Sequence, residues 1–177
     1  MQRIMVVGTS CSGKTTLARC VAATLDVPHV ELDALHWGPG WSQCPLDEFR
    51  EVVREHTRGS RWVVDGNYGK VRDIVLARAT DAIWLNYSFP VVFGRALSRT
   101  GRRVVSGEEL FGGNRETFRS AFLSGDSIPW WVLRTYRGRK REYRELFSTG
   151  AGSKVRLTEL RRQRDADRLL DLLRGAV

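Results

Sequence analysis

Hydrophobic and polar positions alternate along this chain with two different periods. Short runs rich in β-branched residues indicate strands, and between them apolar residues recur every three or four positions, which is the helical spacing. From Lys14 to Leu25, for example, Leu17, Val21 and Ala22 share one helix face. The predicted strands are 3–7, 29–32, 61–64, 82–86 and 154–157, and the predicted helices are 14–25, 46–57, 71–79, 91–103 and 165–174. Strands that alternate with helices are typical of an α/β domain with a parallel sheet.

The second half of the chain departs from this alternation in two places. Between 104 and 125 the pattern weakens, because glycines and serines interrupt it at 106, 107, 112, 113, 124 and 125. We interpret about 102–125 as a mobile lid. Between 128 and 147 aromatic residues and arginines interleave. This arrangement predicts a long helix with a packed aromatic side and with arginines that face a site or solvent.

Length and composition favour one domain without a membrane span. The 177 residues, 42% of them hydrophobic, suffice for one compact core, so we expect a single domain over 1–177. No apolar run approaches the roughly 20 residues that cross a bilayer, and the N-terminal run is too short for a secretory signal. We expect a cytoplasmic protein, a monomer or homodimer. Cys11, Cys20 and Cys44 are odd in number and lack metal-type spacing, which predicts reduced thiols.

The second half of the chain contributes all of the formal net charge of +9. Residues 1–90 hold 10 Lys and Arg against 10 Asp and Glu, whereas residues 91–177 hold 19 against 10. Concentrated arginine suits polyphosphate binding and equally suits weak contact with nucleic acid. In the densest run a solvated helix face and a nucleic-acid patch remain alternatives. That run comprises Arg137, Arg139, Lys140, Arg141 and Arg144.

One segment carries a motif with a specific chemistry. The residues GTSCSGKT, from Gly8 to Thr15, match GxxxxGK[ST] in full and lie between a predicted strand and a predicted helix. The glycines let backbone N–H groups turn toward phosphate oxygens at the positive end of a helix. The segment therefore predicts that ATP and Mg²⁺ bind here.

The motif assigns a task to each of its residues. Lys14 is expected to reach the β- and γ-phosphates as a catalytic cation, and the Thr15 hydroxyl is expected to bind Mg²⁺. Cys11 is interpreted as a small filler, with a thiol pKa lowered by the helix N-terminus as the alternative. The full set of predicted nucleotide ligands is Gly8, Ser10, Cys11, Ser12, Gly13, Lys14, Thr15 and Thr16.

With two further segments, this loop resembles a known family. GTSCSGKTT at the start, LDALHWGPGW after the second predicted strand and WVVDGNY at the third are together similar to small P-loop kinases related to adenylate kinase. Within that group the chain resembles the bacterial DNA topology modulation proteins, whose name records a genetic phenotype and not a substrate. The resemblance implies the P-loop NTPase fold: a five-stranded parallel sheet of order 2-3-1-4-5 flanked by helices, a substrate-binding region and a small helical lid.

Two carboxylates follow predicted strands and are expected to face one cleft. Asp33 is a candidate to orient or deprotonate an acceptor hydroxyl, or to reach Mg²⁺ through water, with a helix cap as the alternative. Asp65 is assigned to the metal, although Asp-Gly is also a common turn dipeptide. The resemblance places Asp65 at the Asp of the adenylate kinase motif DGFPR. The sequence here is DGNY, and the missing arginine argues against AMP as the acceptor.

The acceptor and the lid have their own candidate residues. His36, Trp37 and Trp41 occupy a Gly/Pro-rich loop, where they would stack on a base or close over an acceptor, or would simply pack the loop. Asn67 is assigned to the same substrate-binding region as these residues and Asp33. Arginines that offset charge during transfer are expected from the end of one helix and from the lid, namely Arg99, Arg115 and Arg119.

Three functions fit these features. The first is an ATP-dependent phosphotransferase that moves the γ-phosphoryl group to a small acceptor, such as a nucleoside, a nucleotide or another hydroxyl compound. The alternative is an ATP-binding regulatory protein whose basic second half contacts nucleic acid, and the third is a hydrolase without an acceptor. The convergence of the Asp33 and Asp65 segments on one cleft favours the kinase.

Overall fold

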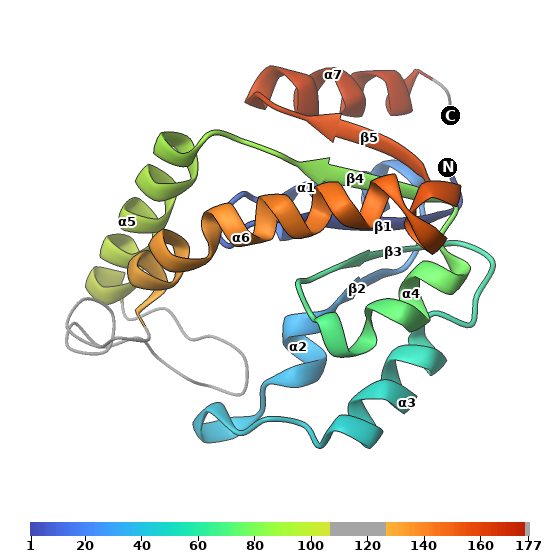
Figure 1. Ribbon diagram of the computed structural model, residues 1–177, viewed down its shortest axis with the longest axis horizontal. Helices are drawn as coiled ribbons and strands as arrows, with labels where there is room; N and C mark the ends of the chain where they lie inside the picture. The colour runs from blue at the N-terminus through green and yellow to red at the C-terminus, as the bar shows by residue number, and fades with distance from the viewer. Residues whose placement is uncertain (107–126, 176–177) are drawn as a thin grey trace.

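Five strands form one sheet in the order β2-β3-β1-β4-β5 (Figure 1). The computed structural model describes residues 1–106 and 127–175. The strands are β1 (Arg3–Gly8), β2 (His29–Glu31), β3 (Trp62–Asp65), β4 (Asp81–Leu85) and β5 (Arg156–Leu160). Every neighbouring pair is parallel. The predicted strand order and strand direction are therefore confirmed.

Helices cover both faces of this sheet. In Figure 1 α6 runs across the sheet in front of β1 and β4, and α7 lies beside β5. The helices are α1 (Lys14–Leu25), α2 (Leu32–His36), α3 (Leu46–His56), α4 (Arg72–Arg78), α5 (Phe89–Ser106), α6 (Ile128–Ser148) and α7 (Gln163–Arg174), with 3-10 turns η1 (Pro39–Trp41), η2 (Gly69–Val71) and η5 (Gly150–Lys154). Among the described residues, no helix has the length and apolar character that a membrane crossing requires.

The central strand β1 is buried on both faces, and its side chains alternate between two hydrophobic clusters. Ile4 and Val6 belong to the cluster that α1 and α7 cover, whereas Met5 and Val7 belong to the cluster that α3 and α4 cover. A strand with a period of two and apolar residues on both sides is the pattern of a central parallel strand. The β1 strand is thereby held rigidly, and the loop that follows it starts from a fixed point.

Several predicted boundaries differ from the structure by one to three residues, and three of these differences change how a segment is described. Leu32 does not end β2 but starts the helix α2, a five-residue element too short for periodicity to detect. The helix α5 ends at Ser106 and not at 103, so the first residues of the segment predicted as the lid continue this helix. The last strand covers 156–160 and not 154–157, because residues 150–154 form η5. Residues 107–125 of the predicted lid lie outside the described residues.

Candidate active site

The loop between β1 and α1 has a backbone that requires glycine at two positions. Gly13 has φ of 95°, a left-handed conformation that side chains disfavour. At Gly8 an added Cβ would lie 2.7 Å from Ser12 Oγ and 2.9 Å from the Leu85 carbonyl oxygen. The motif glycines are thus needed for the left-handed turn and for close contact with β4.

The N-terminus of α1 is built to receive an anion. Gly13 occupies the N-cap position of the helix, and no side chain accepts a hydrogen bond from the first backbone N–H groups there. Ser12 Oγ is buried and has no hydrogen-bond partner in the described residues. Ser10 is half-buried and Thr16 is exposed at the same end of the helix. Uncapped N–H groups and an unsatisfied hydroxyl together fit phosphate oxygens.

Lys14 lies inside this loop with its ammonium group folded back on the backbone. Its Nζ donates a hydrogen bond to the Thr9 carbonyl oxygen at 3.1 Å. Burial lowers the pKa of Lys14, and the nearby carboxylates of Asp33 and Asp65 partly oppose that shift. Phosphate oxygens would supply the negative charge that the buried ammonium group lacks in the free protein.

Thr15 and Asp65 meet as the motif and the sheet order predict. Thr15 Oγ1 donates a hydrogen bond to Asp65 Oδ1 at 2.8 Å, and the other carboxylate oxygen, Oδ2, lies 2.7 Å from His29 Nε2. Asp65 ends β3, where Val6 of β1 is its register partner, and its side chain is only 1% exposed. A hydroxyl and a buried carboxylate are hard oxygen donors, so this pair fits Mg²⁺ and its waters.

The second carboxylate, Asp33, is held by a residue from another element. Tyr68, which follows β3, donates a hydrogen bond from its hydroxyl to Asp33 Oδ1 at 2.6 Å. Burial and the charge of Asp33 raise the pKa of Tyr68, so the phenol remains protonated and can donate. Because α2 is helical, Asp33 and His36 lie on one side of it, and the His36 ring is 4.7 Å from the Tyr68 ring.

His36 belongs to an aromatic cluster beside Asp33. Its ring lies 4.8 Å from Trp37 and 4.9 Å from Phe49, and Trp37 lies 5.9 Å from Trp41. Burial lowers the pKa of His36, which keeps its ring neutral near pH 7. Trp41 is 41% exposed, at the end of η1. The predicted aromatic residues are therefore adjacent, with Trp41 at the outer edge.

Asn67 is held by a hydrogen bond from α6, a helix that is distant from it in sequence. Tyr143 of α6 donates a hydrogen bond to Asn67 Oδ1 at 2.5 Å. Burial raises the pKa of Tyr143 to about 12, and the Gly8 backbone N–H partly opposes that shift. Asn67, which follows β3, is thus fixed to α6.

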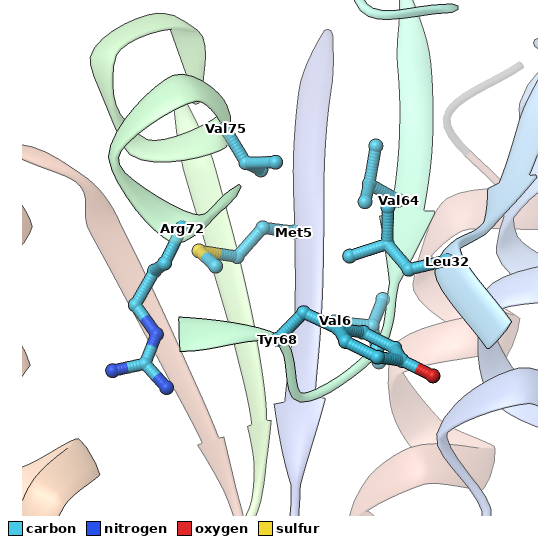
Figure 2. A pocket seen from close by; sticks show the side chains of 8 residues that line it. Met5, Val6, Leu32, Val64, Tyr68, Arg72 and Val75 are labelled. Atoms are coloured by element: carbon cyan, nitrogen blue, oxygen red, sulfur yellow. The ribbon is translucent and has the colours of Figure 1, made fainter. Parts of the chain in front are cut away.

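A small pocket of about 10 Å³, large enough for about one water, lies under this region. Met5, Leu32, Tyr68 and Arg72 are among the residues that line it (Figure 2). Figure 2 shows the Arg72 guanidinium directed away from the Tyr68 hydroxyl. Arg72 instead forms an ion pair with Glu142 of α6 at 2.6 Å. The Arg72 guanidinium therefore joins α4 to α6 and does not face the Tyr68 hydroxyl.

Two arginines of α5, Arg95 and Arg99, interact with residues of the loop between β1 and α1. Arg99 interacts with the Cys11 thiol and lowers the thiol pKa, but burial has the larger effect and raises it overall. This direction is the opposite of the lowered thiol pKa considered as the alternative for Cys11. Arg95 donates to the Ser12 carbonyl oxygen at 2.8 Å, which fixes the loop to α5. Arg115 and Arg119 lie outside the described residues.

Sequence reasoning missed three residues of this site: His29, Tyr68 and Tyr143. For His29 a signal existed, since strand alternation in HVE places His29 and Glu31 on one face, and Glu31 is the register partner of Asp65. Tyr68 belonged to the WVVDGNY segment without a task of its own. Tyr143 lies 76 positions from its partner Asn67, and no local pattern could pair them.

Comparison with solved structures shows the same fold in small P-loop kinases. A gluconokinase from Sinorhizobium meliloti 1021 matches with a TM-score of 0.53 and 18% identity, over 99% of this chain and 94% of that one. A shikimate kinase from Bacteroides thetaiotaomicron matches with a TM-score of 0.54 and 15% identity, over 99% and 97%. No protein-family model and no curated protein sequence matches. The predicted P-loop NTPase fold is thus confirmed, and the resemblance to topology modulation proteins stays a prediction.

Proposed function

We propose that this protein is a phosphotransferase that moves the γ-phosphoryl group of ATP to a hydroxyl group of a small acceptor. The observation that carries the proposal is the meeting of three groups from separate elements. Lys14 comes from the phosphate loop, Asp65 from the end of β3 and Asp33 from α2. Thr15, the residue after Lys14, donates a hydrogen bond to Asp65 Oδ1 at 2.8 Å, and the charges of both carboxylates oppose the lowering of the Lys14 pKa. A cation, a metal-directed carboxylate and a second carboxylate around one point are the parts that phosphoryl transfer needs.

The residues of the site divide the chemistry between them. The N-terminus of α1 and Lys14 would bind the triphosphate, while Thr15 and Asp65 would hold Mg²⁺, which when bound neutralises phosphate charge. Asp33 would accept the proton of the acceptor hydroxyl as its oxygen bonds to phosphorus and the bond to ADP breaks. Because Tyr68 already occupies Asp33 Oδ1, the other oxygen, Oδ2, is the one that would take the proton.

The acceptor would lie between Asp33, the aromatic cluster around His36 and the end of β3. This placement follows from geometry, because the phosphate loop closes one side of the Asp33 and Asp65 pair and an in-line acceptor approaches from the other. Arg99 lies close enough to Cys11 to reach the loop from α5 and would offset charge there. The gluconokinase and shikimate kinase share this fold and are named for small acceptors, which agrees with the proposal.

A transfer assay tests the proposal. The protein is incubated with γ-labelled ATP, Mg²⁺ and a panel of nucleosides, nucleotides, sugars and other small alcohols, and Asp33→Asn serves as the matched control. We expect label in one class of acceptor and much less with the variant. Release of label only to water would support the hydrolase. ATP binding without turnover, together with salt-dependent binding of nucleic acid, would support the regulatory protein.

A further inference from the structure

Asp65 is held from two sides, and only one of these contacts belongs to the nucleotide motif. Its Oδ1 accepts the Thr15 hydroxyl at 2.8 Å, and its Oδ2 lies 2.7 Å from His29 Nε2. With 1% of its side chain exposed, Asp65 has almost no contact with solvent. A buried carboxylate oxygen without a hydrogen-bond partner is destabilising, so the His29 contact contributes to the orientation of this carboxylate.

We propose that His29 is a positioning residue of the metal site, whose Nε2–H donates to Asp65 Oδ2 and thereby keeps Oδ1 turned toward Thr15. His29 itself does not touch the metal or the nucleotide. It acts on them through Asp65, as outer partners orient the ligands of metal sites in general. The proposal rests on the function proposed above only in so far as Mg²⁺ accompanies the nucleotide.

The register of β2 against β3 places His29 within reach of the Asp65 carboxylate. His29 is the register partner of Val63 in β2, and Glu31, two residues later, is the partner of Asp65. His29 is therefore a diagonal neighbour of Asp65 on the same face of the sheet, two residues before the register partner of Asp65, and its ring reaches the carboxylate from there. The side chain is 17% exposed, so the contact is largely shielded from water.

Glu31 shows why Asp65 needs a fixed orientation. It is half-buried, and burial together with the charges of Asp65 and Asp33 raises its pKa, while His29 opposes that shift. Glu31 is also the register partner of Asp65, so a second carboxylate lies across from Asp65 on the neighbouring strand. A donor on Oδ2 fixes the plane of the Asp65 carboxylate, which leaves Oδ1 in place for Thr15.

Two variants of His29 separate positioning from mere packing. His29→Leu keeps a side chain of comparable bulk but has no donor, whereas His29→Gln presents an amide N–H at about the same reach as Nε2. The exposed His56, whose ring bonds the Val52 carbonyl oxygen of its own helix, provides the matched control His56→Leu. ATP affinity is measured by calorimetry for each protein, once in excess Mg²⁺ and once in chelator.

We expect His29→Leu to lose about tenfold or more of its affinity in Mg²⁺, the range seen when an outer partner of a metal ligand is removed, and to bind as the wild type in chelator. His29→Gln should recover most of the loss, and His56→Leu should match the wild type.

Equal losses of ATP affinity in Mg²⁺ and in chelator, or no loss in either, would overturn the positioning role. If His29→Leu does not fold, a Gln variant with wild-type stability but a lowered Mg²⁺ dependence would also overturn it. Wild-type ATP affinity that ignores Mg²⁺ would instead contradict the proposed function.

Discussion

At the scale of single residues, the site is an arrangement of buried or half-buried charges whose partners come from different elements. Lys14 has its pKa lowered by burial, and the two carboxylates that oppose this shift are Asp33 and Asp65. Each of these carboxylates has its own neutral donor, Tyr68 for Asp33 and Thr15 for Asp65. These hydrogen bonds fix the orientation of both carboxylates in the free protein.

Replacing Lys14 by Ala should lower ATP affinity roughly 10- to 100-fold, because a charge-assisted hydrogen bond contributes about 1.5–3 kcal/mol. The variant should melt no lower than the wild type, since burial already disfavours the charged form of Lys14. Calorimetric titration and thermal melting check the two parts. Lys70→Ala, at an exposed site outside the loop, is the matched control. A folded Lys14→Ala variant with wild-type affinity would exclude the loop as the nucleotide site.

Two carboxamide variants should separate the carboxylates by task. Asp33→Asn should lower the rate of transfer by about 10²–10⁴, the range for a lost general base, while ATP affinity stays unchanged. Asp65→Asn should weaken the dependence on Mg²⁺ as well. Metal titration and single-turnover rates, measured on both variants with the identified acceptor, distinguish them. Wild-type turnover in both would place the acceptor elsewhere.

At the scale of elements, the close contact between α2 and the end of β3 holds the site together. Gly66 directly follows Asp65, and a Cβ at this position would lie 2.7 Å from Leu32 Cβ at the start of α2. Its φ of 143° also falls where a side chain is strained. The absence of a side chain at Gly66 thus lets α2 bring Asp33 close to Asp65.

Alanine at two glycines should have opposite effects on stability. Gly66→Ala should lower the free energy of unfolding by about 1–3 kcal/mol, through overpacking against Leu32 and backbone strain. Gly138→Ala should raise it by roughly 0.5–1 kcal/mol, because Gly138 is an exposed position of α6 with nothing within 4 Å of an added Cβ. Urea titration measures both. Gly66→Ala with wild-type stability would refute the tight contact.

At the scale of the whole molecule, α6 connects regions that are remote in the chain. Tyr136 packs with the cluster beneath α1 and donates to the Tyr87 carbonyl oxygen at 2.7 Å. Tyr143 packs with the other cluster and holds Asn67, and Glu142 pairs with Arg72 of α4. The helix that carries the basic run 137–144 is therefore also a structural support of the site.

The buried phenol of Tyr143 predicts a loss of stability at alkaline pH. Its pKa is about 12 in the folded protein and 10.0 when unperturbed. The pKa is higher in the folded than in the unfolded protein, so the stabilisation by the protonated Tyr143 phenol is complete below pH 10. As the pH rises from 10 toward 12, the free energy of unfolding should fall by on the order of 2–3 kcal/mol. Tyr143→Phe should flatten this part of the curve of unfolding free energy against pH. Parallel curves for both proteins would contradict the assigned cause.

The loop between β1 and α1 could be predicted from the sequence because all of its parts are local. Gly8, Gly13, Lys14 and Thr15 lie within eight positions, and the strand and helix on either side follow from apolar periodicity alone. The strand order came from resemblance and was confirmed. The start of α2 was missed because five residues do not establish a helical period, and Arg115 and Arg119 remain predictions.

Only the tertiary structure decided which side chains meet around that loop. Asp65 contacts His29 across 36 positions and Thr15 across 50, and Tyr68 reaches Asp33 across 35. These contacts depend on which strands are neighbours, on their register and on a short helix that turns Asp33 toward Tyr68. Such contacts leave no local pattern in the chain, because the distance between two side chains is fixed by the packing of the elements that carry them and not by their separation in sequence.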